Sequence, residues 1–408
     1  MKCRHCQAEL SLQMMDLGSS PPSNAYLSAA QLAEPETWYP LRVFTCTQCW
    51  LVQTEDYAHY AELFSSEYAY FSSYSTSWLA HSHHYVDLVT RRFALSGASH
   101  VVEVAANDGY LLQYVKAAGI PCTGIEPTAS TARAARAKGL EIVEEFFGVA
   151  LAQKLVAQGK AADLSAANNV LAHVPDVNDF VAGFATLLKP HGVATFEFPH
   201  LMRTIAECQF DTIYHEHFSY LSFTAVQRLF AANGLEVFDV EELPTHGGSL
   251  RVYAQRRDTG SRPQEPGVDR LLGQEAEAGI ETISYYADFQ SRADDIRDGL
   301  LSFLIAARRD GKRVGAYGAA AKGNTLLNYA GVRSGMLPWV VDRNPAKQGQ
   351  FMPGSRVPIV DEERLRGERP DYVLILPWNL KTEVMGQLDY IREWGGRFVC
   401  AVPRIEVL

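Results

Sequence analysis

The sequence predicts an α/β protein built from a small N-terminal metal-binding module and two sheet domains. Three observations lead to this class. Two Cys-x-x-Cys pairs lie near the start, and short apolar segments alternate with helical ones from about residue 99 and again from residue 313. With 408 residues, the chain exceeds what one hydrophobic core accommodates. We place the domain boundaries at residues 1–66, 67–257 and 258–408.

Composition predicts a soluble, cytoplasmic protein. The chain is 47% hydrophobic and 21% charged, and it has no apolar run near the roughly 20 residues that span a bilayer. Residues 1–6 lack the apolar core of a secretion signal. A formal charge of −10 argues against nucleic-acid binding, which depends on neutralising phosphates. We expect a small-molecule substrate, no nucleic acid, no membrane, and a monomer or homodimer.

The two cysteine pairs predict a structural zinc site. Cys3 and Cys6 form the first pair, and Cys46 and Cys49 form the second. Each pair presents two sulfurs from one tight turn, and four thiolates complete a tetrahedral zinc site with no open position for a substrate. A redox Cys-x-x-Cys is the alternative, but it does not predict a second pair.

The sequence pattern of the first sheet domain predicts a crevice that binds adenosine. Residues 100–104 form an apolar strand, residues 105–109 a tight turn and residues 110–118 a helix closed by Gly119. The next strand, residues 122–126, ends in Glu126, whose carboxylate can accept both hydroxyls of a ribose.

Local sequence favours S-adenosylmethionine over a nicotinamide cofactor. There is no GxGxxG motif, and the acidic Asp108 in the turn would repel a diphosphate. Residues 187–192 resemble the turn before the fifth strand of class I methyltransferases, and residues 163–172 supply the fourth strand. A zinc-containing NAD(P)-dependent oxidoreductase acting on a nucleotide sugar remains the alternative. The predicted cofactor-binding residues are Glu103, Ala105, Asn107, Asp108, Gly109, Tyr110, Leu111, Glu126, Pro127 and Asn168.

A cluster of ionisable side chains in residues 214–220, YHEHFSY, indicates proton-transfer chemistry. The HEH spacing is i and i+2, which does not match the HExxH helix of metalloproteases. In an extended segment Tyr214 and Glu216 would share one face and His217 would lie on the other, whereas a turn would break that separation. A noncatalytic scaffold is a further alternative, although it does not explain this density of titratable groups.

These features together resemble the deoxysugar C-methyltransferases, which add a methyl group to C3 of nucleotide-linked 4-keto-6-deoxysugars, usually linked to dTDP. The resemblance spans essentially the whole chain. Its motifs are the cysteine pairs, YAYFSSY (68–74), NDGYLL (107–112), YHEHF (214–218) and HGGSLR (246–251). The family usually has glycine where Ala105 stands, and alanine is well tolerated there if its φ is negative.

The resemblance implies a set of site residues. His217 is expected as the general base, with Tyr214 and Glu216 orienting or polarising groups around it, and Tyr68 as a second phenol near the sugar. Asn169 and His173 are expected to bind or polarise the keto sugar. Other residues implied to contact the substrate are Tyr70, His246, Gly247, Ser249 and Arg251.

The sequence pattern of the C-terminal domain predicts a second, Rossmann-like sheet. Its strands are expected at residues 313–318, 337–341 and 371–376, with a small-residue turn at residues 319–324. Small residues and a lysine at such a turn can receive a phosphate. We expect Lys322, Asn324 and Asn379 to bind the diphosphate of the substrate, although this domain could instead be a scaffold that closes the cleft.

Overall fold

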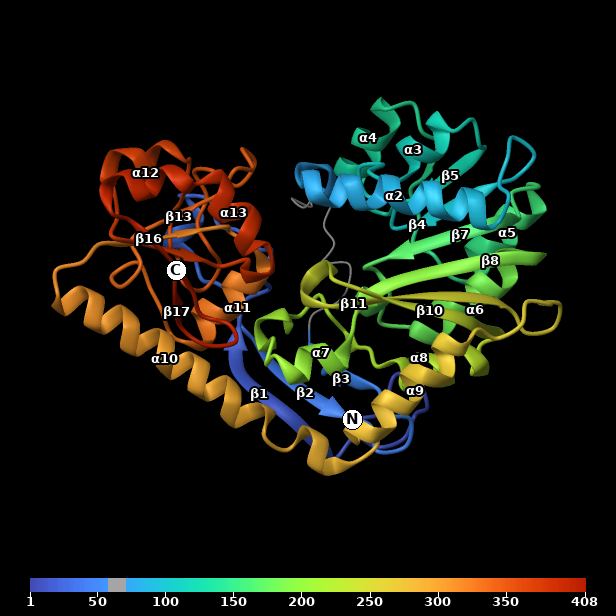
Figure 1. The fold of residues 1–408 in the computed structure, drawn as a ribbon, viewed down its shortest axis with the longest axis horizontal. Coiled ribbons are helices and arrows are strands. Elements are labelled where there is room, and N and C mark those ends of the chain that lie inside the picture. Colours follow the sequence, from blue (N-terminus) through green and yellow to red (C-terminus); the bar gives the residue numbers. More distant parts are fainter. Residues whose placement is uncertain (58–70) are drawn as a thin grey trace.

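The computed structural model describes residues 1–57 and 71–408 and arranges them around three sheets (Figure 1). Tyr68 and Tyr70, two of the expected site residues, lie outside the described residues. Among the described helices, none combines the length and apolar character needed to cross a membrane.

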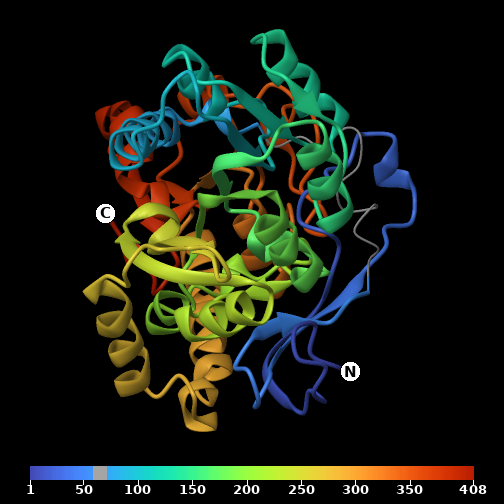
Figure 2. The same cartoon turned by 90° about the vertical axis from the view of Figure 1, so that its right-hand side faces the viewer.

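The N-terminal sheet has the order β1-β2-β3-β9 and is antiparallel. Its fourth strand comes from the middle domain: in β9, Tyr220 pairs with Val52 and Ser219 pairs with Gln53. The end of the YHEHFSY segment is therefore a strand of the cysteine-containing module. Figure 2 shows the blue N-terminal chain running alongside the middle domain. The elements are β1 (Leu12–Ser20), η1 (Gln31–Ala33), β2 (Tyr39–Thr45), β3 (Val52–Thr54) and β9 (Ser219–Tyr220).

The middle domain is a seven-stranded sheet of order β10-β11-β8-β7-β4-β5-β6. Strands β6, β5, β4, β7 and β8 are parallel, and β11 is antiparallel to both of its neighbours. The carboxyl ends of the parallel strands therefore meet at one edge, where doubly wound sheets bind their ligands. The strands are β4 (Val101–Val104), β5 (Cys122–Ile125), β6 (Ile142–Val143), β7 (Ala162–Asn168), β8 (Leu188–Pro199), β10 (Leu235–Leu243) and β11 (Ser249–Arg256).

Helices cover both faces of this sheet. The first turn is longer than the sequence predicts: α3 begins at Leu112, so Tyr110 and Leu111 still belong to the turn after β4. The helices are η2 (Ser72–Tyr74), α2 (Thr76–Arg92), α3 (Leu112–Ala117), α4 (Ala129–Ala137), α5 (Val149–Ala157), η3 (Leu171–His173), α6 (Val177–Leu187), α7 (Leu201–Ala206), η4 (Phe210–Thr212), α8 (Phe223–Ala232) and η5 (Thr245–Gly247).

Two helices, α9 (Pro266–Ala278) and α10 (Phe289–Arg309), connect the middle and C-terminal domains (Figure 1). The C-terminal sheet has the order β14-β13-β12-β15-β16-β17, parallel except for β17. The expected turn at residues 319–324 is shorter, because α11 begins at Ala321. The remaining elements are η6 (Ile283–Tyr286), β12 (Val314–Tyr317), α11 (Ala321–Tyr329), β13 (Val340–Val341), β14 (Ile359–Val360), α12 (Glu363–Glu368), β15 (Tyr372–Ile375), η7 (Trp378–Leu380), α13 (Lys381–Gln387), η8 (Asp389–Trp394), β16 (Arg397–Cys400) and β17 (Glu406–Val407).

One hydrophobic core extends across the domain boundaries. Met15 on β1 and Val43 on β2 belong to the same buried cluster as Ile205 on α7, Leu300 on α10 and Val340 on β13. Because burial of apolar surface is the main stabilising contribution, this shared core fixes the N-terminal and C-terminal parts against one another.

Candidate active site

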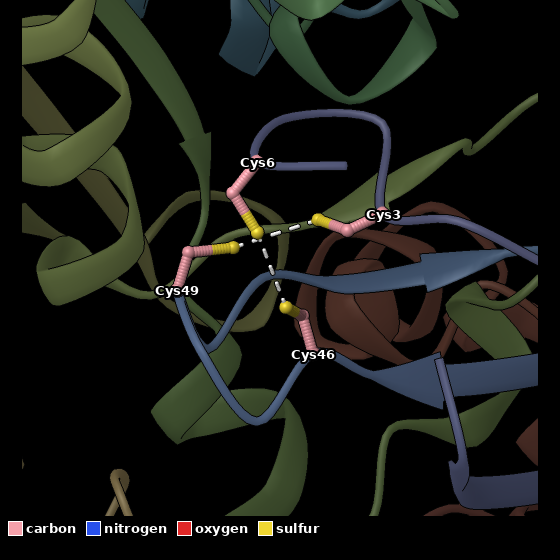
Figure 3. A group of neighbouring side chains, drawn as sticks. All are labelled: Cys3, Cys6, Cys46 and Cys49. Carbon is pink, nitrogen blue, oxygen red and sulfur yellow. Dashed lines mark hydrogen bonds between the residues drawn. The ribbon is translucent and has the colours of Figure 1, made fainter. Parts of the chain in front are cut away.

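The four cysteines of the two pairs converge. Their sulfur atoms all lie within 4.8 Å of one another, and Figure 3 shows the four side chains pointing toward a common centre. The Nε2–H of Gln53 donates to the sulfur of Cys3 at 3.2 Å, and the backbone N–H of Gln48 lies 3.4 Å from the sulfur of Cys46. Donors of this kind stabilise thiolates, so the four sulfurs fit a tetrahedral zinc ion with no open coordination position.

A second feature is a cavity of about 540 Å³, here called the central cavity, at the carboxyl edge of the middle sheet. Its wall also includes residues from the N-terminal module and the C-terminal domain. The predicted site residues that line it are Ala105, Asn107, Tyr110, Glu126, Pro127, Asn168, Asn169, His173, Tyr214, His217, His246, Lys322 and Asn379. The described candidates that do not line it are Glu103, Asp108, Gly109, Leu111, Glu216, Gly247, Ser249, Arg251 and Asn324.

The turn after β4 is held by Glu126 at the end of β5. One carboxylate oxygen accepts the backbone N–H of Asn107 at 2.9 Å, and the other accepts the backbone N–H of Thr128 at 2.9 Å. The hydroxyl of Thr128 donates to that second oxygen as well. A carboxylate has about four acceptor positions, so Glu126 retains one for a further donor such as a ribose hydroxyl. Ala105 has φ +59°, not the negative value at which alanine is well tolerated. The backbone at this position is therefore the left-handed one that favours glycine.

Two acidic candidates lie behind this turn. Glu103 is fully buried in β4, and burial raises the pKa of its carboxyl well above the usual value. Asp108 is buried beside Lys138, whose Nζ lies 3.5 Å from the carboxylate. Neither residue lines the central cavity.

Tyr214 and His217 form a hydrogen-bonded dyad. Residues 214–217 form a turn, in which the N–H of His217 donates to the carbonyl of Tyr214 at 2.9 Å, so the alternation of an extended segment does not occur. Nδ1 of His217 donates to the carbonyl of Thr212 at 2.8 Å, and Nε2 accepts the hydroxyl of Tyr214 at 2.7 Å. Burial, with smaller electrostatic contributions from His173 and Lys322, lowers the pKa of His217 well below its usual value. The imidazole is therefore a neutral base at neutral pH.

Two further imidazoles, His173 and His246, line the central cavity. Nδ1 of His173 donates to the carbonyl of Glu216 at 2.8 Å, so its Nε2 is an acceptor. The amide Nδ2 of Asn169 donates to Nε2 of His246 at 3.1 Å, so Nδ1 of His246 carries a proton that can be donated. Burial lowers the pKa of both imidazoles to about 4.

Lys322, near the start of α11, brings positive charge to the same cavity. Its Nζ donates to Oδ1 of Asn379 at 3.0 Å and lies 4.4 Å from the centre of the Trp378 ring. Trp378 donates its indole N–H to Asp211 at 2.7 Å. Burial lowers the pKa of Lys322 to about 8 and raises the pKa of Asp211 to about 6. Lys322 therefore remains mostly protonated at neutral pH.

Arg251 lies outside the cavity wall in a buried ion pair. Its Nη2 lies 2.9 Å from the carboxylate of Glu197, which also accepts from His81 and Thr245, each at 2.9 Å. Its Nη1 lies 3.3 Å from Glu241. Both terminal nitrogens of the guanidinium are therefore paired with carboxylates, and Arg251 lies behind the cavity wall.

Three further candidates outside the wall, Gly247, Ser249 and Asn324, also have contacts of their own. Gly247 has φ +89°, and a Cβ there would lie 2.5 Å from Trp378. The hydroxyl of Ser249 donates to the carbonyl of Thr245 at 2.9 Å, and the amide of Asn324 donates to the carbonyl of Ser23 at 2.5 Å.

Several residues of the cavity wall were not predicted from the sequence: Asn24, Ser72, Trp78, Thr128, Phe146, Phe147, Thr212 and Lys347. Phe146 and Phe147 follow the third parallel strand, so the rule that ligands bind at carboxyl edges could have identified them. Asn24 lies in a loop of the N-terminal module, and its spacing gives no signal for a site in another domain.

Comparisons with known proteins agree with this architecture. A methyltransferase domain matches residues 78–240, a C-methyltransferase C-terminal domain matches residues 244–403, and a zinc-binding domain matches residues 3–64. The C-methyltransferase NovU of Streptomyces niveus is 33% identical over 407 residues, covering 100% of this chain and 96% of that protein.

Similarity to solved structures is weaker. The PH0226 protein of Pyrococcus horikoshii OT3 is 15% identical, with a TM-score of 0.39 over 49% of this chain and 100% of that chain. The magnesium protoporphyrin IX methyltransferase of Synechocystis PCC 6803, with bound SAH, is 16% identical, with a TM-score of 0.35 over 44% of this chain and 83% of that chain.

The fold and the site define a class I methyltransferase that carries a structural zinc module and a second α/β domain. The chain belongs to the C-methyltransferase family that includes NovU. It is an S-adenosylmethionine-dependent C-methyltransferase with zinc as its second cofactor. Family membership thus favours the methyl donor over the nicotinamide alternative.

Proposed function

We propose that this enzyme transfers a methyl group to C3 of a dTDP-linked 4-keto-6-deoxysugar, through an enolate formed by proton abstraction. The observation that supports this most is that one cavity joins three functions. It brings together the ribose-binding edge of the middle sheet, a neutral Tyr214–His217 dyad and the cation of Lys322. Removal of a proton beside a ketone needs such a base together with groups that stabilise the enolate.

The residues at the edge of the middle sheet fit S-adenosylmethionine. We assign Glu126 to the ribose and the turn of Asn107 to the methionine part. The amide oxygens of Asn168 and Asn169 are buried without a hydrogen-bond partner among the described residues, and a ligand at this edge would supply one. When bound, this cofactor supplies an electrophilic methyl group on a sulfonium.

The dyad supplies the base. The C3–H bond breaks and its electron pair remains on the sugar as the enolate. The proton passes to the phenol oxygen of Tyr214 while the phenol proton moves to Nε2 of His217, which already accepts it at 2.7 Å. The enolate carbon then bonds to the methyl carbon and the carbon–sulfur bond breaks, leaving the thioether. Tyr68, outside the described residues, remains our candidate for a second phenol near the sugar.

The hydrogen-bond directions divide the work among the other polar groups. Nε2 of His173 can accept a sugar hydroxyl but cannot donate to a ketone while Nδ1 holds the proton. Polarisation of the ketone therefore falls to the Asn169–His246 pair. We assign the diphosphate to Lys322, Asn379 and the start of α11, whose N-cap residue Ala320 provides no side-chain cap. We further infer a cytosolic location, in which the four cysteines stay reduced.

The test uses mass spectrometry of the product formed from a dTDP-4-keto-6-deoxysugar and labelled S-adenosylmethionine. Wild-type enzyme should add one labelled methyl group. His217→Ala should lose turnover while the affinity for S-adenosylhomocysteine, measured by calorimetry, is retained. His191→Ala, at an exposed histidine, is the matched control and should be fully active. A wild-type enzyme that leaves the sugar unmethylated refutes the substrate, and an active His217→Ala refutes the base.

A further inference from the structure

The N-terminal module extends to the central cavity through residues 23–27, here called the arm. Asn324 of the C-terminal domain donates to the carbonyl of Ser23 at 2.5 Å. The hydroxyl of Tyr26 donates to the carbonyl of Ala319 at 2.7 Å, and Leu27 pairs with Phe351. The arm is therefore fixed on both sides of Asn24, which lies in the cavity wall.

Asn24 is bound to Glu216 through two donors. Its backbone N–H and its amide Nδ2 donate to the same carboxylate oxygen of Glu216, at 3.2 and 3.1 Å. A carboxylate oxygen can bind only the NH₂ end of an amide, so the amide oxygen of Asn24 points away from Glu216. Glu216 itself is only 1% exposed and does not line the cavity. Glu216 therefore sets the orientation of the Asn24 amide without touching a ligand.

Glu216 also places Asn24 beside the reacting centre. The backbone carbonyl of Glu216 accepts a hydrogen bond from Nδ1 of His173. The ring centres of His173 and His217 are 4.5 Å apart. The following residues enter the N-terminal sheet as β9, and Thr54 of that sheet donates to the carbonyl of His217 at 3.1 Å. The catalytic turn and the arm are consequently held by the same module.

We propose that Asn24 is a substrate-contacting residue contributed by the zinc module, whose amide oxygen accepts a hydrogen bond from a hydroxyl of the sugar. Glu216 is the positioning residue that fixes this amide and takes no part in proton transfer. The inference rests on the proposed sugar substrate, because it needs a hydroxyl donor in the cavity. It gives the N-terminal module a place in substrate recognition beyond zinc binding.

The test compares Asn24→Ala, Glu216→Gln, the double variant and the control Ser28→Ala. Ser28 is exposed on the same segment, and its hydroxyl donates to Gln31 within it. Asn24→Ala keeps the backbone N–H that holds the arm to Glu216, so the fold should persist. We expect about a tenfold loss of kcat/KM for the keto sugar nucleotide. Binding of S-adenosylhomocysteine and of dTDP alone should remain unchanged.

The double variant distinguishes a positioning role of Glu216 from a purely structural one. If Glu216 acts through Asn24, the two losses do not add, and the double variant is no slower than the slower single variant. Additive losses overturn the assignment of Glu216. An Asn24→Ala enzyme with wild-type kcat/KM, or one equally weakened toward dTDP alone, overturns the sugar contact. Wild-type enzyme that fails to methylate the sugar instead refutes the proposed function, whatever the variants do.

Discussion

Replacement of Arg251 by methionine should destabilise the middle domain and leave substrate binding intact. Arg251 and Glu197 are 3% and 0% exposed in their side chains. Burial alone would raise the pKa of Glu197, but the bonds from His81 and the charge of Arg251 outweigh it and hold the pKa below its usual value. The pair therefore contributes its full stabilisation at pH values above the ordinary carboxyl pKa, which is about 4.3. That contribution is lost as the pH falls through the lowered pKa of Glu197. At pH 7 the full contribution is present.

Removal of one partner of a buried pair costs about 3 to 5 kcal/mol, because the other charge is left buried. For a domain of this size the melting temperature should fall by roughly 10 °C. Calorimetry at pH 7 measures that change, and Glu197→Gln combined with Arg251→Met should recover a large part of it. KM for the sugar nucleotide, measured well below the new melting temperature, should stay within about twofold of wild type. A raised KM with an unchanged melting temperature would show that Arg251 binds the substrate and that the ion pair is not its main role.

Three further predictions concern the cofactor turn, the pH profile and the metal. Ala105→Gly should raise the free energy of unfolding, measured by denaturant titration, by up to about 1 kcal/mol. Glycine adopts φ +59° without strain, and this gain exceeds the loss that comes from the larger entropy of the unfolded chain. In a pH profile, kcat/KM should remain constant at and somewhat below pH 6.5, because the lowered pKa of His217 keeps this base unprotonated there. Above about pH 8, kcat/KM should fall as Lys322 loses its proton. Lys322→Arg should move only the basic limb upward. Chelation of zinc should lower the melting temperature, and added Zn²⁺ should restore it.

Much of the site could be predicted because parallel strands bring their carboxyl ends to one edge. Asn168 ends a strand that the apolar pattern identifies, Glu126 and Asn169 directly follow such strands, and all three line the cavity. The cysteine pairs were equally informative, since four sulfurs near one point are what their spacing implies. Local pattern and motif spacing suffice where a rule links position along a strand to position in space.

Other features could not be predicted because they depend on tertiary contacts. Extended geometry would have separated Tyr214 from His217, whereas the turn places both on the cavity. Asn24 reaches the site only because the arm is fixed to a domain about 300 residues away in sequence. Arg251 carries the charge that a phosphate needs, and only the fold shows that Glu197 and Glu241 already occupy it. No periodicity encodes such contacts.

Backbone strain gathers at the central cavity and explains why the Glu197 network matters for the chemistry. Ala105, Asn107, Asn169 and His246 all have positive φ and all line the cavity. Each such residue costs on the order of 1 kcal/mol, so the surrounding structure must hold it in place. Glu197 does this twice: its backbone carbonyl accepts the N–H of Asn169 at 2.7 Å, and its carboxylate accepts the hydroxyl of Thr245, next to His246. Glu197 thus helps to hold Asn169 and His246 in hydrogen-bond contact, although it lies outside the cavity wall.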